Sequence, residues 1–238
     1  MWSFRQHYRQ ASVLARRALG VEPRIRETVR LPLEFHGNAA GGWNIVRGSL
    51  DAASIVVDVG LGEDAAFSQS IARTYGCIVN GFDPTPRAIH YIKGLSDNQI
   101  RLFGLGLGIS PGPARFFLPN NAAHVSGSVN RERHLGQQTI EVDLVTLGQV
   151  FDLLNSDRID LLKLDIEGSE FDLIGSAEFE RYADRIGQLC IEFHHRWKGR
   201  GKRSTQDACE VLNALGFRCA WYSRSTNEEF LFVRSPPR

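Results

Sequence analysis

The stretch Val56–Phe67, VVDVGLGEDAAF, decides the fold. It completes the apolar run SIVVDV over Ser54–Val59, which is typical of a strand buried on both faces of a parallel sheet. Two glycines spaced one residue apart follow, and a helical pattern then covers Asp64–Tyr75. A buried strand, a glycine turn and a helix in this order predict the first unit of a nucleoside-binding α/β fold.

The charges around the glycines decide between two kinds of ligand. Gly60, Gly62 and Ala65 satisfy the dinucleotide pattern G-x-G-x-x-G/A. A dinucleotide would place its pyrophosphate at the start of the helix, where Glu63 and Asp64 lie. Each carboxylate would repel a phosphate by on the order of 1–4 kcal/mol. S-adenosylmethionine carries a sulfonium cation and no phosphate, so we predict this cofactor and keep a nicotinamide-dependent oxidoreductase as the alternative.

The residues expected around this cofactor follow from their places at strand ends. Asp58 is expected to take the amino group of the ligand or to order the loop through water, while the glycines let the backbone come close. Asp83 ends the strand Cys77–Phe82, where an acidic side chain typically meets ribose hydroxyls. Glu63 and Asp64 are also expected to cap the following helix. The predicted cofactor-binding residues are Asp58, Gly60, Leu61, Gly62, Glu63, Asp83 and Pro84.

Strand and helix patterns alternate along the rest of the chain. This alternation predicts an α/β fold with a mostly parallel sheet and helices on both faces. Two hairpin-like strands, Phe217–Tyr222 and Glu229–Val233, close the chain. The other expected strands are Gln99–Leu107, Arg115–Leu118, Thr139–Leu144, Asp160–Leu164 and Gln188–Phe193, and the other expected helices are Pro86–Gly94, Leu147–Leu154, Ser169–Ala177 and Thr205–Leu215.

A second group of polar residues lies at the ends of two later strands. In IDLLKLDIEGS, Ile159–Ser169, the charged Lys163, Asp165 and Glu167 alternate with apolar residues. A salt bridge of Lys163 with one of these carboxylates would explain part of the pattern. The next strand ends in Glu192 and His194, which share one face. We expect Asp165, Glu192 and His194 to converge in one crevice, as a general base or as ligands of a divalent metal ion.

The polar segment Leu118–Val129, LPNNAAHVSGSV, lies between two short strands. Its His124, Ser126 and Ser128 are candidates for contact with the substrate. The Lys198–Arg203 segment, KGRGKR, is expected to be a solvated basic loop.

The N-terminal residues differ in pattern from the rest. Residues 2–20 predict a basic amphipathic helix that ends at Gly20, and a connector with Pro23 and Pro32 follows. We divide the chain into a helical arm and connector, residues 1–34, and a catalytic domain, residues 35–238. The arm is expected to pack on the domain or on a partner subunit of a homo-oligomer, and a membrane-surface role is the alternative.

Composition excludes several classes of protein. The 238 residues carry a formal net charge of +1, which gives no basic field for nucleic acid. The sequence shows no apolar run that would span a bilayer, and the basic N-terminus lacks the apolar core of a signal peptide. None of the four cysteines forms a C-x-x-C pair. We therefore expect free thiols and a cytoplasmic location.

These motifs together resemble the FkbM-type family of S-adenosylmethionine-dependent methyltransferases over roughly residues 35–235. The most specific match is IDLLKLDIEGSEFDLI, Ile159–Ile174. VVDVGLGEDAAF, GFDPTPRAI, the GGW of Gly41–Trp43, the P-N-x-x-H-V-S-type loop of Pro119–Ser126, QLCIEFHHRW and EEFLFV also match.

The resemblance implies a Rossmann-like methyltransferase fold and methyl transfer, usually to oxygen. It implies that Asp165, Glu167, Glu192 and His194 surround the methyl-transfer crevice. The acceptor is left open among sugar hydroxyls, natural-product hydroxyls and lipid-linked glycans. A scaffold that binds the cofactor without turnover is the non-enzymatic alternative.

Overall fold

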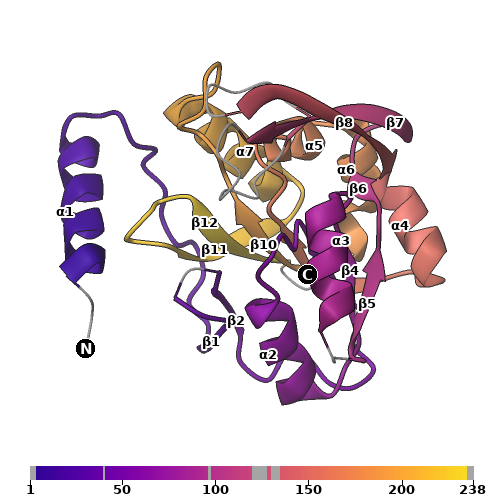
Figure 1. Ribbon diagram of the computed structural model, residues 1–238. Coiled ribbons are helices and arrows are strands. Elements are labelled where there is room, and N and C mark those ends of the chain that lie inside the picture. Colours follow the sequence, from indigo (N-terminus) through magenta and orange to yellow (C-terminus); the bar gives the residue numbers. More distant parts are fainter. Residues whose placement is uncertain (1–3, 40, 96–97, 120–127, 130–134, 235–238) are drawn as a thin grey trace.

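A seven-stranded sheet forms the centre of the protein (Figure 1). The computed structural model describes residues 4–39, 41–95, 98–119, 128–129 and 135–234. The strand order is β11-β12-β10-β9-β3-β4-β5, in which β3, β4, β5, β9 and β10 are parallel and β12 is antiparallel to both of its neighbours. The bounds are β3 Val56–Val59, β4 Val79–Phe82, β5 Ile100–Phe103, β9 Ile159–Leu164, β10 Ile186–Glu192, β11 Phe217–Tyr222 and β12 Glu229–Arg234.

Both faces of this sheet are buried, which is why most positions of its central strands are apolar. The helices are α2 Ala66–Tyr75, α3 Pro86–Gly94, α4 Leu147–Leu154, α5 Glu170–Ile174, α6 Ala177–Tyr182 and α7 Lys202–Ala214. Val57 and Leu162 face one hydrophobic core, together with residues of the four helices α4, α5, α6 and α7. Val56 and Leu161 face a second core on the other side. The predicted mostly parallel α/β fold with an antiparallel C-terminal hairpin is confirmed.

The strand order reverses at β3, and this reversal places the site. The chain continues from β3 to β4 on one side of the sheet, and β9 returns to the other side of β3. Open α/β sheets bind ligands in the crevice beyond the carboxyl ends of the strands at such a point. The ends of β3, β4, β9 and β10 therefore define where a ligand would lie.

The expected strand Gln99–Leu107 was wrong in extent. It divides into β5 and β6 Gly106–Leu107, and β6 belongs to a separate sheet with β8 Leu135–Val145 and β7 Gly112–Pro119. A Cβ atom on Gly106 would lie 2.6 Å from Leu144, so the glycine lets this strand pack closely against β8. The alternation of apolar residues carries no signal for the change of sheet.

Two further expectations need correction. The expected helix Ser169–Ala177 is broken into α5 and α6, because the Ser176 side chain accepts a hydrogen bond from Phe179 N and starts the second helix. The connector also contains a hairpin that we did not predict, made of β1 Leu33–His36 and β2 Trp43–Val46.

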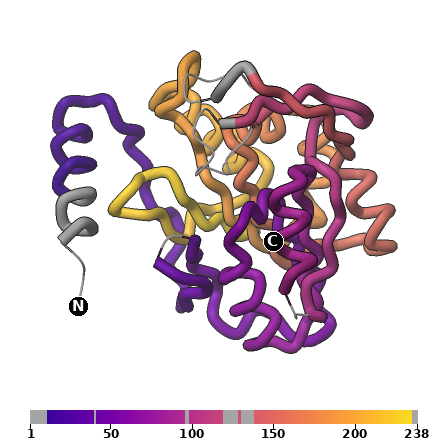
Figure 2. The backbone as a smooth tube through the Cα atoms, viewed as in Figure 1, coloured from indigo at the N-terminus to yellow at the C-terminus, as the bar shows by residue number. Residues whose placement is uncertain are grey.

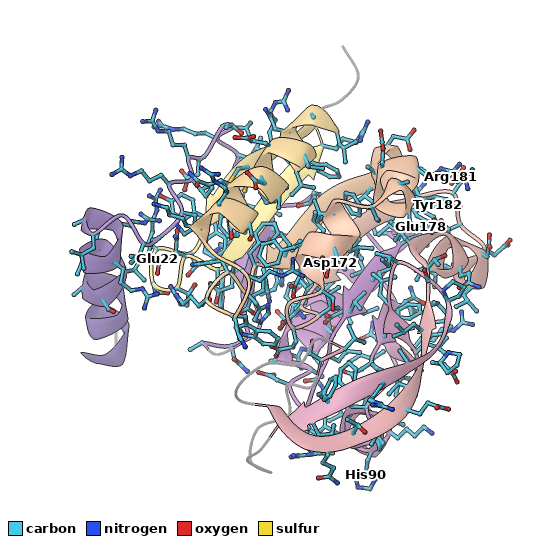
Figure 3. All side chains as sticks on the ribbon, turned by 90° about the horizontal axis from the view of Figure 1, so that it is seen from above. Glu22, His90, Asp172, Glu178, Arg181 and Tyr182 are labelled. Atoms are coloured by element: carbon cyan, nitrogen blue, oxygen red, sulfur yellow. The ribbon has the colours of Figure 1, made fainter. Side chains whose placement is uncertain are left out.

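The N-terminal helix α1, Phe4–Ala18, lies at one side of the sheet-containing body (Figures 1 and 2). The connector that follows it attaches through Glu22, which is buried and lies between α1 and the body in Figure 3. Its carboxylate lies 2.9 Å from His195 Nε2 and accepts hydrogen bonds from Arg196 and Asn227. The connector is thus tied to the segment that follows β10.

The helices of the described residues include none with the length and apolar character needed to cross a lipid bilayer. All four cysteines are free, as expected, and Cys77, Cys190 and Cys219 are buried.

The turn after β3 offers a test of the fold. A Cβ atom on Gly60, where φ is +82°, would lie 1.8 Å from the Asp165 carbonyl oxygen. Gly48 also has a positive φ, +65°, but nothing lies within 4 Å of its Cβ position. Both substitutions to alanine should cost roughly 1–2 kcal/mol for the left-handed backbone. We expect Gly60→Ala to cost about 1–3 kcal/mol more, because backbone must move. Equal urea-unfolding free energies for the two variants would contradict this contact.

Candidate active site

A cavity of about 320 Å³ opens at the carboxyl ends of β3 and β4. Six of the seven expected cofactor-binding residues line it: Gly60, Leu61, Gly62, Glu63, Asp83 and Pro84. Asp165 and Glu167, from the turn after β9, line its other side. The volume falls in the usual range for small-molecule sites, roughly 300–1,000 Å³.

The glycine at position 60 has a structural role in addition to the expected close approach of the backbone to a ligand. Gly60 and Gly62 have φ values of +82° and +58°. The position of a Gly60 Cβ is occupied by the backbone of Asp165, as described above. Gly60 therefore lets the turns after β3 and β9 pack against each other, so that both border one cavity.

Asp58 lies behind this turn and is not among the described residues that line the cavity. Its Oδ1 accepts a hydrogen bond from Lys163 Nζ at 2.8 Å, and its Oδ2 accepts one from Ser68 Oγ at 2.6 Å. Burial alone would lower the pKa of Lys163, but Asp58 and other carboxylates raise it above its usual value. The structure thus replaces the expected ligand contact of Asp58 with an internal ion pair, and it gives Lys163 this partner instead of Asp165 or Glu167.

Asp83 joins the turn after β3 to the turn after β4. Its Oδ2 accepts from Gly62 N at 2.9 Å, and its Oδ1 accepts from Thr85 N at 2.9 Å and Thr85 Oγ1 at 2.6 Å. A carboxylate has about four acceptor positions, so these bonds leave capacity for a ligand hydroxyl.

The two acidic residues after the glycines behave differently from each other. Asp64 Oδ1 accepts a hydrogen bond from Ala66 N at the start of α2, as expected of a cap. Glu63 instead forms an ion pair with Arg87 of α3 at 2.6 Å, so our expectation that it also caps the helix is wrong. Both residues line the cavity and leave its rim acidic.

His194 lies in a cluster with four carboxylates, two of which, Asp165 and Glu167, line the cavity. Its Nε2 lies 3.1 Å from Glu167 and 3.9 Å from both Asp165 and Glu192, while its Nδ1 lies 3.0 Å from Glu170. The predicted convergence of Asp165, Glu192 and His194 therefore occurs. Of these three, the cavity lining among the described residues includes Asp165 alone.

Glu170 is the member of the cluster that sequence reasoning missed. It falls within the expected helix Ser169–Ala177 and was given no role of its own, but it is fully buried. Its Oε1 accepts from Ile166 N at 3.0 Å and its Oε2 from Gly168 N at 2.9 Å, so it holds the turn after β9 as well as His194. Its place three residues after Glu167, within the charged run, was the available signal.

The turn after β9 is held in a conformation that aims Glu167 at His194. Glu167 has a φ of +52°, which is uncommon for a residue with a side chain. Ser128 Oγ donates a hydrogen bond of 2.6 Å to the Glu167 carbonyl, and Ser128 is buried. Ser128 thus supports this turn, in place of the substrate contact that we expected. His124 and Ser126 lie outside the described residues.

The carboxylates change the protonation of the cluster. Burial would lower the pKa of His194, but the surrounding carboxylates, Glu170 first, raise it well above its usual value. The carboxylates around His194 thus favour the protonated form of its imidazole. Burial raises the pKa of Glu192 well above its usual value, and the nearby Asp165 adds to this effect.

Asp165 is the group that can exchange a proton with the cavity near neutral pH. Burial, partly opposed by Lys163, raises its pKa to about 7. Its Oδ1 is buried and has no hydrogen-bond partner among the residues the structure describes. A poorly stabilised carboxylate with this pKa is suited to general base chemistry.

The cluster also contains a set of atoms with the spacing of metal ligands. One ligand atom from each of Asp165, Glu170 and His194 lies within 4.8 Å of the others. Both nitrogens of His194 already pair with carboxylates, and both oxygens of Glu170 accept backbone hydrogen bonds. A metal ion would have to displace these contacts and the proton on His194.

The strand order, the antiparallel hairpin and the cavity at the reversal point define a Rossmann-like α/β protein with a ligand site at the carboxyl ends of its strands. The Methyltransferase FkbM domain pattern matches residues 53–219, and the chain belongs to this family. Membership implies S-adenosylmethionine as the methyl donor. The resemblance stated from the motifs is thereby confirmed.

Two relatives of the chain are methyltransferase-like proteins. The chain is 28% identical over 144 residues to the probable methyltransferase-like protein 24 of Rattus norvegicus and 25% identical over 129 residues to that of Homo sapiens. These matches span 59% and 44% of this chain. They cover 33% and 35% of the relatives, about a third of their length.

Among solved structures, the fibrillarin pre-rRNA processing protein of Methanococcus jannaschii has a TM-score of 0.46 at 12% identity, over 77% of this chain and 67% of that one. A methyltransferase from Pyrococcus furiosus has a TM-score of 0.38 at 10% identity, over 98% and 97%.

The raised pKa of Asp165 makes a prediction about stability and pH. The unfolded chain has an aspartate pKa of about 4, and the folded chain has about 7. Between these values the folded state holds the proton more tightly, so this group stabilises the fold below about pH 4, and its contribution is lost as the pH rises toward 7. We expect the unfolding free energy of the wild type, minus that of Asp165→Asn, to fall across this window. A flat difference in urea titrations would mean that Asp165 ionises normally.

Proposed function

We propose that the protein transfers a methyl group from S-adenosylmethionine to a hydroxyl oxygen of a sugar, glycan or natural-product small molecule. The observation that carries this proposal is a carboxylate, Asp165, with a pKa of about 7 at the wall of the cavity. A hydroxyl must lose its proton as it is methylated, and a base with such a pKa can take that proton at neutral pH.

The cavity suits the cofactor in its charge and in its polar groups. S-adenosylmethionine supplies a methyl group already activated by the sulfonium charge. Asp83 would accept hydrogen bonds from the ribose hydroxyls, and the backbone at Leu61 and Gly62 would border the nucleoside. Asp64 at the rim favours a cationic ligand and repels phosphates, which disfavours the nicotinamide alternative, while Arg87 offsets the charge of Glu63.

We assign separate roles to the members of the charged cluster. Asp165 acts as the base, because it lines the cavity and its Oδ1 has no hydrogen-bond partner in the described part of the chain. His194 acts as a cation that offsets part of the negative charge of the surrounding carboxylates. It attracts the Asp165 carboxylate once Asp165 loses its proton. Glu167 and Glu170 hold His194 in place at 3.1 and 3.0 Å. The charges of Glu167 and Glu170 also add to the proton affinity of Asp165, whose pKa is raised first of all by burial.

The free cysteines bear on the cellular location of the protein. Four free cysteines are typical of a reducing compartment, so we propose that the protein acts in the cytoplasm.

Replacing the base should separate catalysis from binding. We expect Asp165→Asn to lower kcat by about 100- to 10,000-fold, the range for loss of a general base, while S-adenosylhomocysteine still binds. The measurement is methyl transfer from labelled S-adenosylmethionine to a panel of hydroxylated acceptors. Asp152→Asn, an exposed aspartate on α4, is the matched control. Unchanged turnover in Asp165→Asn would refute the assignment.

Calorimetric titration tests the cofactor directly. S-adenosylhomocysteine should bind the wild type, and NAD should not. Asp83→Ala should weaken the binding about tenfold or more, because a charged hydrogen-bond acceptor is lost. Preference for NAD would restore the oxidoreductase alternative. Binding without turnover on any acceptor would favour a scaffold.

The occupied ligand atoms of His194 and Glu170 predict a reaction that does not need a metal ion. Treatment with EDTA, followed by gel filtration, should leave the rate of methyl transfer unchanged. If activity disappears and returns with Mg²⁺, the ion pairs of His194 must give way to a metal ion.

A further inference from the structure

The apolar side of α1 faces away from the protein. Val13 is buried, with 4% of its surface exposed, and turns toward the body. Leu14 is 63% exposed, and Leu19, just beyond the helix, is 78% exposed. Ala11, Ala15 and Ala18, which share the Leu14 side at helical spacing, are also exposed. Leu14 and Ala18 therefore do not pack on the domain, which leaves a partner subunit and a membrane surface as the predicted partners of this side.

The N-terminal residues 1–21, which include α1, carry only positive charges on their side chains. Residues 1–21 contain four arginines and no aspartate or glutamate. Arg16 pairs with Glu22 at 2.7 Å, and Arg17 lies over the Tyr222 ring at 5.1 Å, so the helix is fastened to the body by its charged side. This attachment leaves the apolar side outward.

We propose that α1 is a binding surface for the anionic face of a lipid bilayer. A helix with an apolar side, an arginine-rich side and low overall hydrophobicity lies in the plane of a membrane, with its apolar side in the acyl boundary. Leu14, Leu19 and Val21 enter that boundary, and the positive charge of the arm is attracted to the anionic headgroups beside it. This inference is independent of the proposed reaction.

The charge of the arm selects this partner over a second copy of the chain. Two such helices packed by their apolar sides would bring together eight arginines, four from each copy. Glu22 pairs with Arg16, but residues 1–21 contain no acidic residue for the other arginines. An anionic bilayer supplies both an apolar phase and the opposite charge. Each arginine near such a surface contributes about 1 kcal/mol, and salt screens the effect.

Vesicle co-sedimentation of the full chain tests the proposal. The probes are vesicles of phosphatidylcholine alone and vesicles that also contain phosphatidylserine. We expect pelleting with phosphatidylserine that weakens as salt rises. Leu14→Asp/Leu19→Asp should reduce the binding constant about tenfold or more, and Arg5→Gln should reduce it about fivefold.

The matched control is Ile78→Asp/Ile109→Asp, which places the same charges at exposed apolar positions outside the arm, 54% and 53% exposed. It should pellet like the wild type. Circular dichroism and S-adenosylhomocysteine binding show whether each variant is folded. Failure to pellet with either vesicle would overturn the proposal. So would a dimer in sedimentation velocity that Leu14→Asp/Leu19→Asp dissociates, since a second copy would then cover the face.

Discussion

The buried ion pair between Asp58 and Lys163 is the contact on which the site depends. The two residues face each other in register on β3 and β9, the strands at which the sheet order reverses, and their side chains meet at 2.8 Å. An unpaired charge in such a place would cost several kcal/mol. The pair therefore fixes the relation between these strands. Lys163 also reaches the Gly60 carbonyl at 3.4 Å, so the same contact positions the turn that borders the cavity.

Beyond that pair, the site sorts its charges into two layers. The deeper layer holds His194 as a cation against Glu167 and Glu170, and these groups largely satisfy one another. The outer layer leaves Asp165 close to several carboxylates and 3.9 Å from His194, too far for a hydrogen bond. A carboxyl in this position is stabilised in its protonated form. The pKa of Asp165 is thus raised because it is buried and because His194 is paired with Glu167 and Glu170 instead.

Sequence patterns predicted the elements whose signal is local. The apolar runs of β3 and β9, the helix α3 and the convergence of Asp165 with His194 follow from periodicity and from the rule for strand ends. The partner of Asp58 lies 105 residues away, and no local pattern identifies it. Glu170 was missed because its position early in a helix explained it equally well. The division of Gln99–Leu107 between two sheets depends on Gly106 packing under Leu144, which is a tertiary contact.

The contacts of Glu22 have a consequence for how the chain folds during synthesis. Glu22 precedes His195 by 173 residues and Asn227 by 205. At about 5–20 residues per second, roughly 10–35 s pass before the first of these partners is made. Until then, of the described partners of the Glu22 carboxylate, only Arg16 of α1 has been made, while the first parallel strands can already assemble. The connector and the segment after β10 should therefore lock last, so the two ends of the chain complete the catalytic region together.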